Sequence, residues 1–343
     1  MFKQTTYSLQ FILLLILLIV CLSINICLGS VTIPLADTFK IIFGSTLKES
    51  SSYYIIWEYR LPKAITAVMV GGGLSLSGLL MQTLFRNPLA GPYVLGISSG
   101  ASLGAAILIM GTSLFSAVFS FSAFNDFTLA IASSLGSFLV LFLVLIVAAK
   151  VKDTMALLII GLMFGSITAA IVSVLSYFTK AEKLQQYIFW SFGSLGNLSW
   201  LQLSIVALCT VLGITLSIVS IKPLNALLLG ENYAKSLGIA LKKSRYIIIV
   251  ATGLLAGSIT AFAGPIAFVG LAVPHITKQI FHTTDHKIQI PAVLICGAIL
   301  MLLCDTIAQL PGYMSVLPIN AITSIFGAPV VIWLLLRKRK IIF

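Results

Sequence analysis

Residues 127–149 read FTLAIASSLGSFLVLFLVLIVAA and contain no charged side chain. About 20 apolar residues in a helix cross the hydrocarbon core of a bilayer, so this stretch is long enough to span a membrane. The short polar segment KVKDT at 150–154 separates it from a second stretch of the same kind, MALLIIGLMFGSITAAIVSVLSYF at 155–178. The pair predicts two antiparallel membrane-spanning helices joined by a short loop.

The composition of the whole chain agrees with this interpretation. Its 343 residues are 59% hydrophobic and 9% charged, with a mean hydropathy of +1.12. A soluble domain carries about 25% charged residues and could not hide so much apolar surface from water. The composition therefore predicts an all-α polytopic membrane protein, with residues 1–343 forming a single transmembrane domain without a separate soluble domain.

Short polar segments divide the chain into about ten apolar spans. They are 11–29, 63–84, 93–111, 127–149, 155–178, 200–221, 246–262, 266–281, 290–310 and 320–336. The first is interpreted as a retained span, because only Lys3 precedes it and no small-residue cleavage site follows. Ten spans place both termini on the same side of the membrane.

The charges of the loops predict which side that is. The termini and the loops 85–92, 150–154, 222–245 and 282–289 carry most of the basic residues, whereas the opposite loops carry both signs in similar numbers. Basic loops stay in the cytoplasm, so both termini are expected there. The net charge of +12 is then a consequence of topology, and nucleic acid is not expected as a partner.

No motif for catalysis, metal binding or ATP binding occurs in the sequence. The string nearest to a phosphate-binding loop, Gly230 to Ser236, lacks the second glycine. His282 and His286 flank a charged segment, which favours a solvated loop over a metal site, and the five cysteines lie within apolar runs. We expect no enzymatic activity, metal or cofactor in this chain, so any ATP and Mg²⁺ would bind a separate chain.

Glycines within the spans predict close helix packing. Gly96, Gly100 and Gly104 lie on one stripe of the third span, and small residues four apart let helices approach closely in lipid. Packing within the chain is favoured over a dimer seam. The triplet Ala-Gly-Pro occurs at 90–92 and again at 263–265, on opposite sides in the expected topology. A short motif repeated on opposite sides of the membrane is what an inverted repeat would produce.

Asp305 is the only acidic residue placed well inside a predicted span. A charge there costs about 2.5–3.5 kcal/mol on insertion scales, so it should face the interior and pair with a polar group or be protonated. A structural hydrogen-bonding role is favoured, with a role in a transport pathway as the alternative. Arg60 and Lys63 lie at the outer end of the second span, where they either anchor the helix at the interface or dock an acidic partner.

The longest loop expected on the cytoplasmic side is 222–245, KPLNALLLGENYAKSLGIALKKSR. Asn225 to Leu229 predicts a short helix that Gly230 ends. Glu231 to Leu237 predicts a second short helix, with Gly238 as a left-handed cap. The loop either offers a surface that another protein grips, or lies as an amphipathic segment on anionic lipid.

Several segments together resemble the FecCD-type permeases of ABC importers, which carry iron–siderophore complexes, haem or cobalamin across the bacterial inner membrane. The matching segments are Arg60 to Lys63, GLLMQ at 78–82, RNPLAGPYVLGISSGASLG at 86–104, Gly230 to Gly238, GPIAFVGLAVPHITK at 264–278 and LPINAITSIFGAPVVIWLLLRK at 317–338. The resemblance covers nearly the whole chain. It implies the type II importer permease architecture, a homodimer with the path on its two-fold axis, two cytoplasmic ATPase subunits and an extracytoplasmic substrate-binding protein.

The resemblance also implies roles for particular residues. Arg60 and Lys63 match positions that dock carboxylates of the binding protein. The ATPase would contact Leu229, Gly230, Glu231, Ala234, Leu237 and Gly238. The matching segments and the spans together predict that helix packing or the pathway involves Gln82, Asn87, Gly96, Gly100, Gly104 and Asp305. Two positions depart from the family pattern, because Gln309 stands where an arginine is frequent and Val316 replaces an acidic residue.

The resemblance leaves the cargo open, with iron–siderophore expected first, then haem and then cobalamin. The alternative function is a secondary transporter driven by an ion gradient. Such a transporter would need pairs of ionisable residues within the membrane, and Asp305 alone argues against it. A membrane enzyme would need clustered His, Asp or Cys residues at one membrane face, and the sequence has none.

Overall fold

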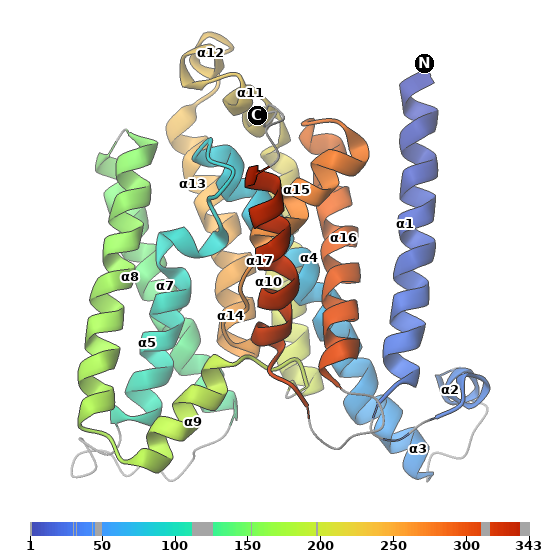
Figure 1. The fold of residues 1–343 in the computed structure, drawn as a ribbon. Coiled ribbons are helices and arrows are strands. Elements are labelled where there is room, and N and C mark those ends of the chain that lie inside the picture. The colour runs from blue at the N-terminus through green and yellow to red at the C-terminus, as the bar shows by residue number, and fades with distance from the viewer. Residues whose placement is uncertain are drawn as a thin grey trace.

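The computed structural model describes residues 2–29, 31, 33–42, 44, 50–111, 126–151, 153–196, 198–309 and 316–336. Within these residues the chain forms helices and no strands, which confirms the predicted fold class (Figure 1). The elements are α1 (Phe2–Cys27), α2 (Leu35–Ile42), α3 (Ser51–Tyr54), η1 (Ile55–Arg60), α4 (Leu61–Leu84), η2 (Pro92–Leu95), α5 (Ile97–Ile109), α7 (Asp126–Lys150), α8 (Thr154–Tyr177), α9 (Ala181–Ser191), α10 (Trp200–Val219), α11 (Ile221–Leu228), α12 (Glu231–Ser236), α13 (Leu241–Thr252), η3 (Gly253–Gly257), α14 (Ser258–Ala263), α15 (Val269–Phe281), α16 (His286–Ala308) and α17 (Ile319–Leu336).

Each of the ten predicted spans corresponds to a helix. In the described part of the chain, 7 helices are long and apolar enough to cross a membrane. They are Tyr7–Cys27, Ser51–Leu84, Phe127–Lys150, Thr154–Tyr177, Trp200–Val219, Leu241–Ala263 and His286–Ala308. The other three predicted spans form the shorter helices α5, α15 and α17.

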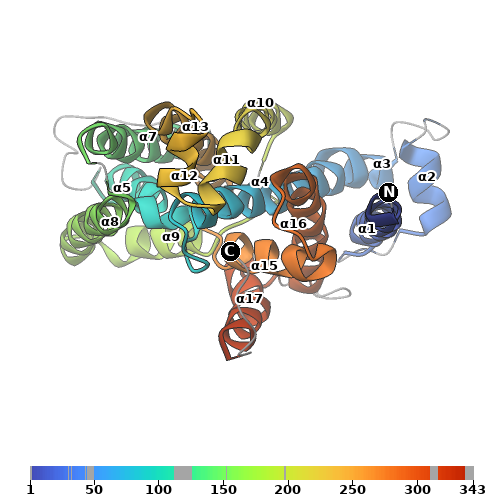
Figure 2. The ribbon, with the colours of Figure 1, turned by 90° about the horizontal axis from the view of Figure 1, so that it is seen from above.

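The helices form a bundle with two distinct ends. The start of α1, the last turn of α17 and the short helices α11 and α12 lie at one end, here named the α12 face (Figure 1). The helices α2, α3 and α9 lie at the other end, here named the α9 face. Seen from above, α4 runs through the middle, between α16 and α1 on one side and α5, α7 and α8 on the other (Figure 2).

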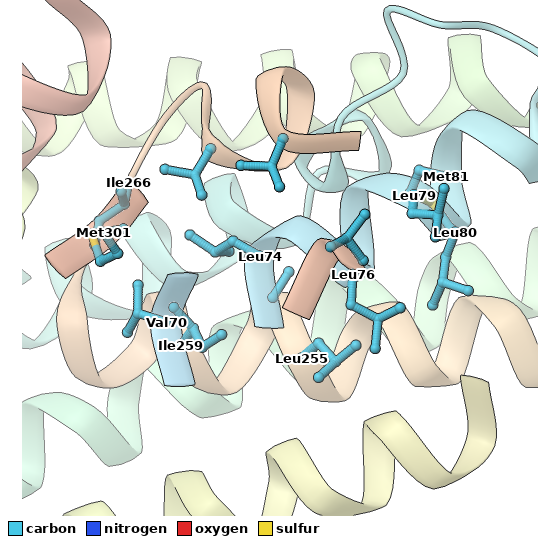
Figure 3. Packing of buried hydrophobic residues seen from close by; sticks show 14 of the residues in the cluster. Val70, Leu74, Leu76, Leu79, Leu80, Met81, Leu255, Ile259, Ile266 and Met301 are labelled. Carbon is cyan, nitrogen blue, oxygen red and sulfur yellow. The ribbon is translucent and has the colours of Figure 1, made fainter. Parts of the chain in front are cut away.

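Helix α4 is the centre of the apolar core. In the spanning helix that contains it, 83% of the residues of the apolar window are buried, against 17% in α1 and in α8. A Cβ on Gly71 would overlap the carbonyl oxygen of Gly297, so glycine is required where α4 and α16 touch. Figure 3 shows part of the surrounding core, with labels on Val70, Leu74, Leu76, Leu79, Leu80, Met81, Leu255, Ile259, Ile266 and Met301.

Two short helices begin in the interior of the bundle and run in opposite directions. Helix α5 follows Gly96, at φ 72°, and α15 follows Phe268, at φ 65°; each helix has 13 residues. Figure 1 shows α5 running toward the α9 face and α15 toward the α12 face. Each of these helices follows one of the two Ala-Gly-Pro triplets. This local match agrees with an inverted repeat. The predicted spans 93–111 and 266–281 began too early, because the left-handed residue delays each helix.

The segment Arg60 to Lys63 was expected at the outer end of the second span, but it does not begin the helix. It lies inside a continuous helix from Ser51 to Leu84. The π-helical turn η1 comes directly before it, and the Leu61 backbone N–H donates to the Ile56 carbonyl. Because Pro62 has no N–H to donate, it fits directly after this irregular turn without breaking the helix.

Candidate functional site

A cavity of about 470 Å³ lies at the α9 face of the bundle. Its walls come from the end of α1, from η1 and the start of α4, from the segment after α9, and from the facing ends of α16 and α17. Arg60, Lys63 and Asp305, which the sequence singled out separately, all line it, as do Gln309 and Val316. The fold therefore brings the predicted outer cations and the intramembrane acid to one place.

Asp305 is buried and all its partners are polar. The Lys63 Nζ lies 3.1 Å from its Oδ1, with the two side chains 18% and 3% exposed. Its Oδ2 accepts hydrogen bonds from Asn25 Nδ2 at 2.9 Å and from Gln309 Nε2 at 2.7 Å. A charge inside a span needs such partners, and these ones tie α1, α4 and α16 together at the α9 face.

Arg60 caps the end of α1. Its Nη1 donates to the carbonyls of Ile26 and Cys27, both at 2.8 Å, and its Nη2 donates to the carbonyl of Val31. The last carbonyls of a helix lack partners within the helix, and a cation there also suits the helix dipole. Both predicted docking cations thus face the cavity but already have partners in the chain, so docking stays a prediction.

Asn25 is the residue of this site that the sequence analysis missed. It is buried and bonds to both Asp305 and the hydroxyl of Thr306, at 2.9 and 3.0 Å. The only local signal was one amide in the otherwise apolar first span. Because Asp305 lies 280 positions away, no local pattern links the two residues.

The two short helices predicted in the loop 222–245 are confirmed, with α11 at Ile221–Leu228 and α12 at Glu231–Ser236. Gly230 at φ 110° separates them, and Gly238 at φ 75° follows α12 in the left-handed region. The sequence placed the start of the first short helix at Asn225, but α11 begins earlier, at Ile221. Leu229, Tyr233 and Leu237 are 63%, 50% and 58% exposed, so the pair presents an apolar surface at the α12 face.

Ion pairing and burial fix α12 to the bundle. Arg245 of α13 lies 2.5 Å from Glu231, and Ala234 is fully buried beneath the helix. A Cβ on Gly230 would lie 3.6 Å from Arg86 Nη1, so the turn between α11 and α12 adjoins the loop after α4. The predicted ATPase-coupling residues therefore divide into exposed apolar ones (Leu229 and Leu237) and anchoring ones (Glu231 and Ala234).

Gln82 and Asn87 have local structural contacts. Gln82 is buried in α4 and donates to the Leu271 carbonyl of α15 at 3.2 Å. The Asn87 Oδ1 accepts from the Leu89 N–H at 2.9 Å and shapes the turn that follows α4. Neither side chain lines the cavity at the α9 face.

The glycine stripe of α5 packs within the chain. A Cβ on Gly100 would lie 2.5 Å from the Gly136 carbonyl oxygen, and one on Gly104 would overlap that of Ala132, both in α7. A Cβ on Gly96 would lie 3.0 Å from the Gly161 carbonyl oxygen in α8. The glycine stripe thus packs against α7 and α8 of the same chain, which is the interpretation favoured over a dimer seam.

The positions of the histidines differ from the expectation that His282 and His286 flank a solvated loop. His282 is exposed, but His286 is 1% exposed and bonds to side chains of two other helices, so the segment 282–287 is not simply a solvated loop. His275 Nε2 lies 2.9 Å from the Pro88 carbonyl oxygen. Among the described residues, no three His, Cys, Asp or Glu side chains are grouped as metal ligands, and the five cysteines are free.

In the described part of the chain, the 7 helices long and apolar enough to cross a membrane, together with the shorter α5, α15 and α17, define a polytopic helical membrane protein. The chain belongs to the FecCD transport family, whose profile matches residues 15–337.

Comparison with known proteins agrees with this assignment. The chain is 36% identical over 326 residues, covering 94% of this chain and 92% of the relative, to the vitamin B12 import system permease protein BtuC of Klebsiella pneumoniae. It is 37% identical over 288 residues, or 83% of this chain and 84% of the relative, to the protein of the same name from Salmonella schwarzengrund. A solved inward-facing structure of a putative metal-chelate type ABC transporter superposes with a TM-score of 0.81 at 29% identity, covering 94% of this chain and 97% of that one.

Proposed function

We propose that this chain is the membrane-spanning permease subunit of a binding-protein-dependent ABC importer in a bacterial inner membrane. The observation that carries the proposal is the FecCD family match over residues 15–337. The exposed pair α11 and α12 supports it, because a permease that lacks its own ATP site must contact a separate ATPase. The single intramembrane acid, held by three polar neighbours, fits an ion-driven transporter poorly.

We place the α12 face in the cytoplasm. The loops at this end carry most of the basic residues of the chain, and basic loops remain on the cytoplasmic side. Both termini are then cytoplasmic. Two copies of the permease would combine with two ATPase subunits, and each ATPase would contact the apolar surface formed by Leu229, Tyr233 and Leu237.

The α9 face would then receive a substrate-binding protein from outside. The cavity there is lined by the cations Arg60 and Lys63, so an acidic side chain is the partner that it suits. Both cations also hold the fold together through α1 and Asp305. Replacing both by glutamate would therefore disturb folding as well as docking.

The cargo that we propose is a metal chelate. The curated relatives named above are vitamin B12 permeases, and the solved neighbour is described as a metal-chelate transporter. These names support cobalamin ahead of iron–siderophore and haem, which reverses the order expected from the resemblance alone.

Uptake by a strain that lacks this gene tests the proposal. Labelled cobalamin, iron–siderophore and haem are supplied separately at limiting concentration. We expect uptake of one of them to be lost, and to be restored by the unaltered gene. A Leu229→Asp/Leu237→Asp variant, present in the membrane at the same level, should not restore it, because a charged surface would no longer fit an apolar ATPase groove.

Two outcomes would contradict the proposal. Restored uptake that persists when the ATPase is inactivated, and stops when the ion gradient is dissipated, would favour a secondary transporter. Full restoration by the Leu229→Asp/Leu237→Asp variant would remove the α11–α12 surface from the coupling contact.

A further inference from the structure

Asn225 of α11 connects this helix to the turn in front of α16. Its Nδ2 donates to Asp285 Oδ1 at 2.7 Å. Its Oδ1 accepts from the His286 backbone N–H at 2.9 Å and lies 2.7 Å from His286 Nδ1. One side-chain amide is therefore bonded through both of its polar atoms, and all of these bonds lead to a single two-residue segment.

His286 continues the connection to α4. Its Nε2 lies 2.9 Å from the Thr83 Oγ1, in the last turn of α4, and the two residues are 1% and 3% exposed. In a neutral ring, Nδ1 carries the proton, because it faces the acceptor oxygen of Asn225. Nε2 then accepts from the Thr83 hydroxyl, whose single hydrogen is shared with the Leu79 carbonyl oxygen at 2.9 Å. An unbroken series of side-chain contacts thus runs from α11 through the start of α16 to α4.

Asp285 strengthens the first contact of this series. Burial alone would raise the pKa of Asp285, but hydrogen bonds from the Lys287 N–H and the Asn225 amide, with the charge of Lys287, lower it below its usual value. The ionised carboxylate caps α16 through the Lys287 N–H at 3.0 Å and also holds Asn225. Hydrogen bonds to a charged group are stronger than those between neutral groups.

The two helices reached by this series are joined at three levels. Thr83 and His286 join α4 and α16 at the α12 face, and Lys63 and Asp305 join them at the α9 face. Between these contacts, Gly71 and Gly297 bring the two backbones together. We expect helices held in this way to move as one body, so that a displacement at one face would reach the other.

We propose that Asn225, Asp285, His286 and Thr83 form a relay of positioning residues that makes α4 and α16 follow the movement of α11. The inference rests on the proposed function, because it takes α11 and α12 as the surface that an ATPase moves. The ion pair between Glu231 and Arg245 connects α12 to α13 instead. The relay leads to the helix pair that lines the cavity at the α9 face through an unbroken series of side-chain hydrogen bonds.

A donor–acceptor swap tests the relay. Asn225→Asp places a second carboxylate against Asp285. Asp285→Asn keeps both an acceptor for Asn225 and a cap for α16. The double variant Asn225→Asp/Asp285→Asn again has one amide and one carboxylate, with their positions exchanged. The permease is reconstituted with its ATPase and binding protein, and the ATP hydrolysed per cargo molecule is measured.

We expect Asn225→Asp to raise the ATP consumed per cargo molecule at least about tenfold, and the double variant to return it to within about threefold of the unaltered protein. Thr83→Val should raise it as well. Thr215→Val is the control, because the hydroxyl oxygens of Thr83 and Thr215 both lie within hydrogen-bonding distance of the carbonyl four residues earlier, but of the two only Thr83 also contacts a side chain of another helix. An unchanged ratio in Asn225→Asp, or no recovery in the double variant, would overturn the relay.

Hydrogen exchange of the permease alone in lipid nanodiscs separates the relay from the proposed function. Asn225→Asp should speed amide exchange in residues 221–228, and the double variant should slow it again. Unchanged exchange in Asn225→Asp would refute the connection without any ATPase. If the unaltered protein shows no ATP-dependent uptake, the proposed function fails, and the exchange data alone decide whether α11 is held by Asn225.

Discussion

The carboxylate of Asp305 lies inside an apolar helix, and both of its oxygens have partners. Lys63 pairs with Oδ1, and two amides donate to Oδ2. Removing one member of a buried ion pair leaves the other charge without compensation. Replacing both members by uncharged residues of similar size removes the uncompensated charge altogether. This difference allows the structural role of Lys63 to be separated from a docking role.

The first prediction concerns this ion pair. Lys63→Met should destabilise the purified protein by about 3 kcal/mol, because Asp305 remains buried without its cation. The double variant Lys63→Met/Asp305→Asn should recover most of the loss. Thermal unfolding in detergent, followed through the reactivity of the buried thiols of Cys296 and Cys304, measures both.

The same double variant tests docking. If Lys63 also binds an acidic side chain of the binding protein, the double variant should melt like the unaltered protein but bind its partner more weakly. Equal affinity would remove Lys63 from the docking surface. A double variant as unstable as Lys63→Met would instead show that the ion pair is not what stabilises this part of the bundle.

At the scale of elements, contacts between glycines set the distances between helices. Helix α5 approaches α7 so closely that a methyl group on Gly104 would occupy the position of the Ala132 carbonyl oxygen. Backbone cannot move aside as a flexible side chain can. By contrast, the nearest atom to a Cβ on Gly257 is Ile97 Cγ2 at 3.5 Å, an ordinary contact.

Alanine substitutions at these two glycines should therefore differ. Gly104→Ala is expected to lower the melting temperature and the yield of folded protein, because α5 and α7 must move apart and lose packing. Gly257→Ala is expected to change neither by much. The measurement is the fraction of monodisperse protein after detergent extraction, together with thermal unfolding. Equal behaviour of the two variants would contradict the close α5–α7 contact.

At the scale of the whole molecule, the ends of the bundle differ in charge and in shape. The α12 face carries the two short helices with an exposed apolar surface, and the α9 face carries the cavity with its cations. The proposed orientation assigns the first to the cytoplasm and the second to the outside. It rests on loop charge and can be tested without knowledge of the cargo.

Accessibility to a membrane-impermeant maleimide tests this orientation. The five native cysteines are replaced, and either Glu182→Cys in α9 or Lys235→Cys in α12 is introduced, since both positions are exposed. In spheroplasts, the cysteine at 182 should be labelled and the one at 235 should react only after the membrane is permeabilised. The reverse pattern would invert the topology and, with it, the assignment of the docking and coupling faces.

Local features of the sequence were sufficient for the ten spans and for α11 and α12, but not for the short helices α2, α3 and α9. Long apolar runs predicted the spans, because a backbone in lipid must bond within its own helix. Gly230 and Gly238 predicted how α11 and α12 end, since both need backbone angles that glycine adopts readily. The family was also evident from motifs spread along the chain.

The partners of the polar residues were decided by tertiary structure. Arg60 caps a helix that ends more than thirty residues earlier, Asp305 meets Asn25 from the opposite part of the chain, and His286 is buried between Asn225 and Thr83. The late starts of α5 and α15 likewise follow from interior turns at Gly96 and Phe268. A sequence pattern reports which residues prefer lipid or a turn. Only the packing of distant helices brings one polar group within hydrogen-bonding distance of another.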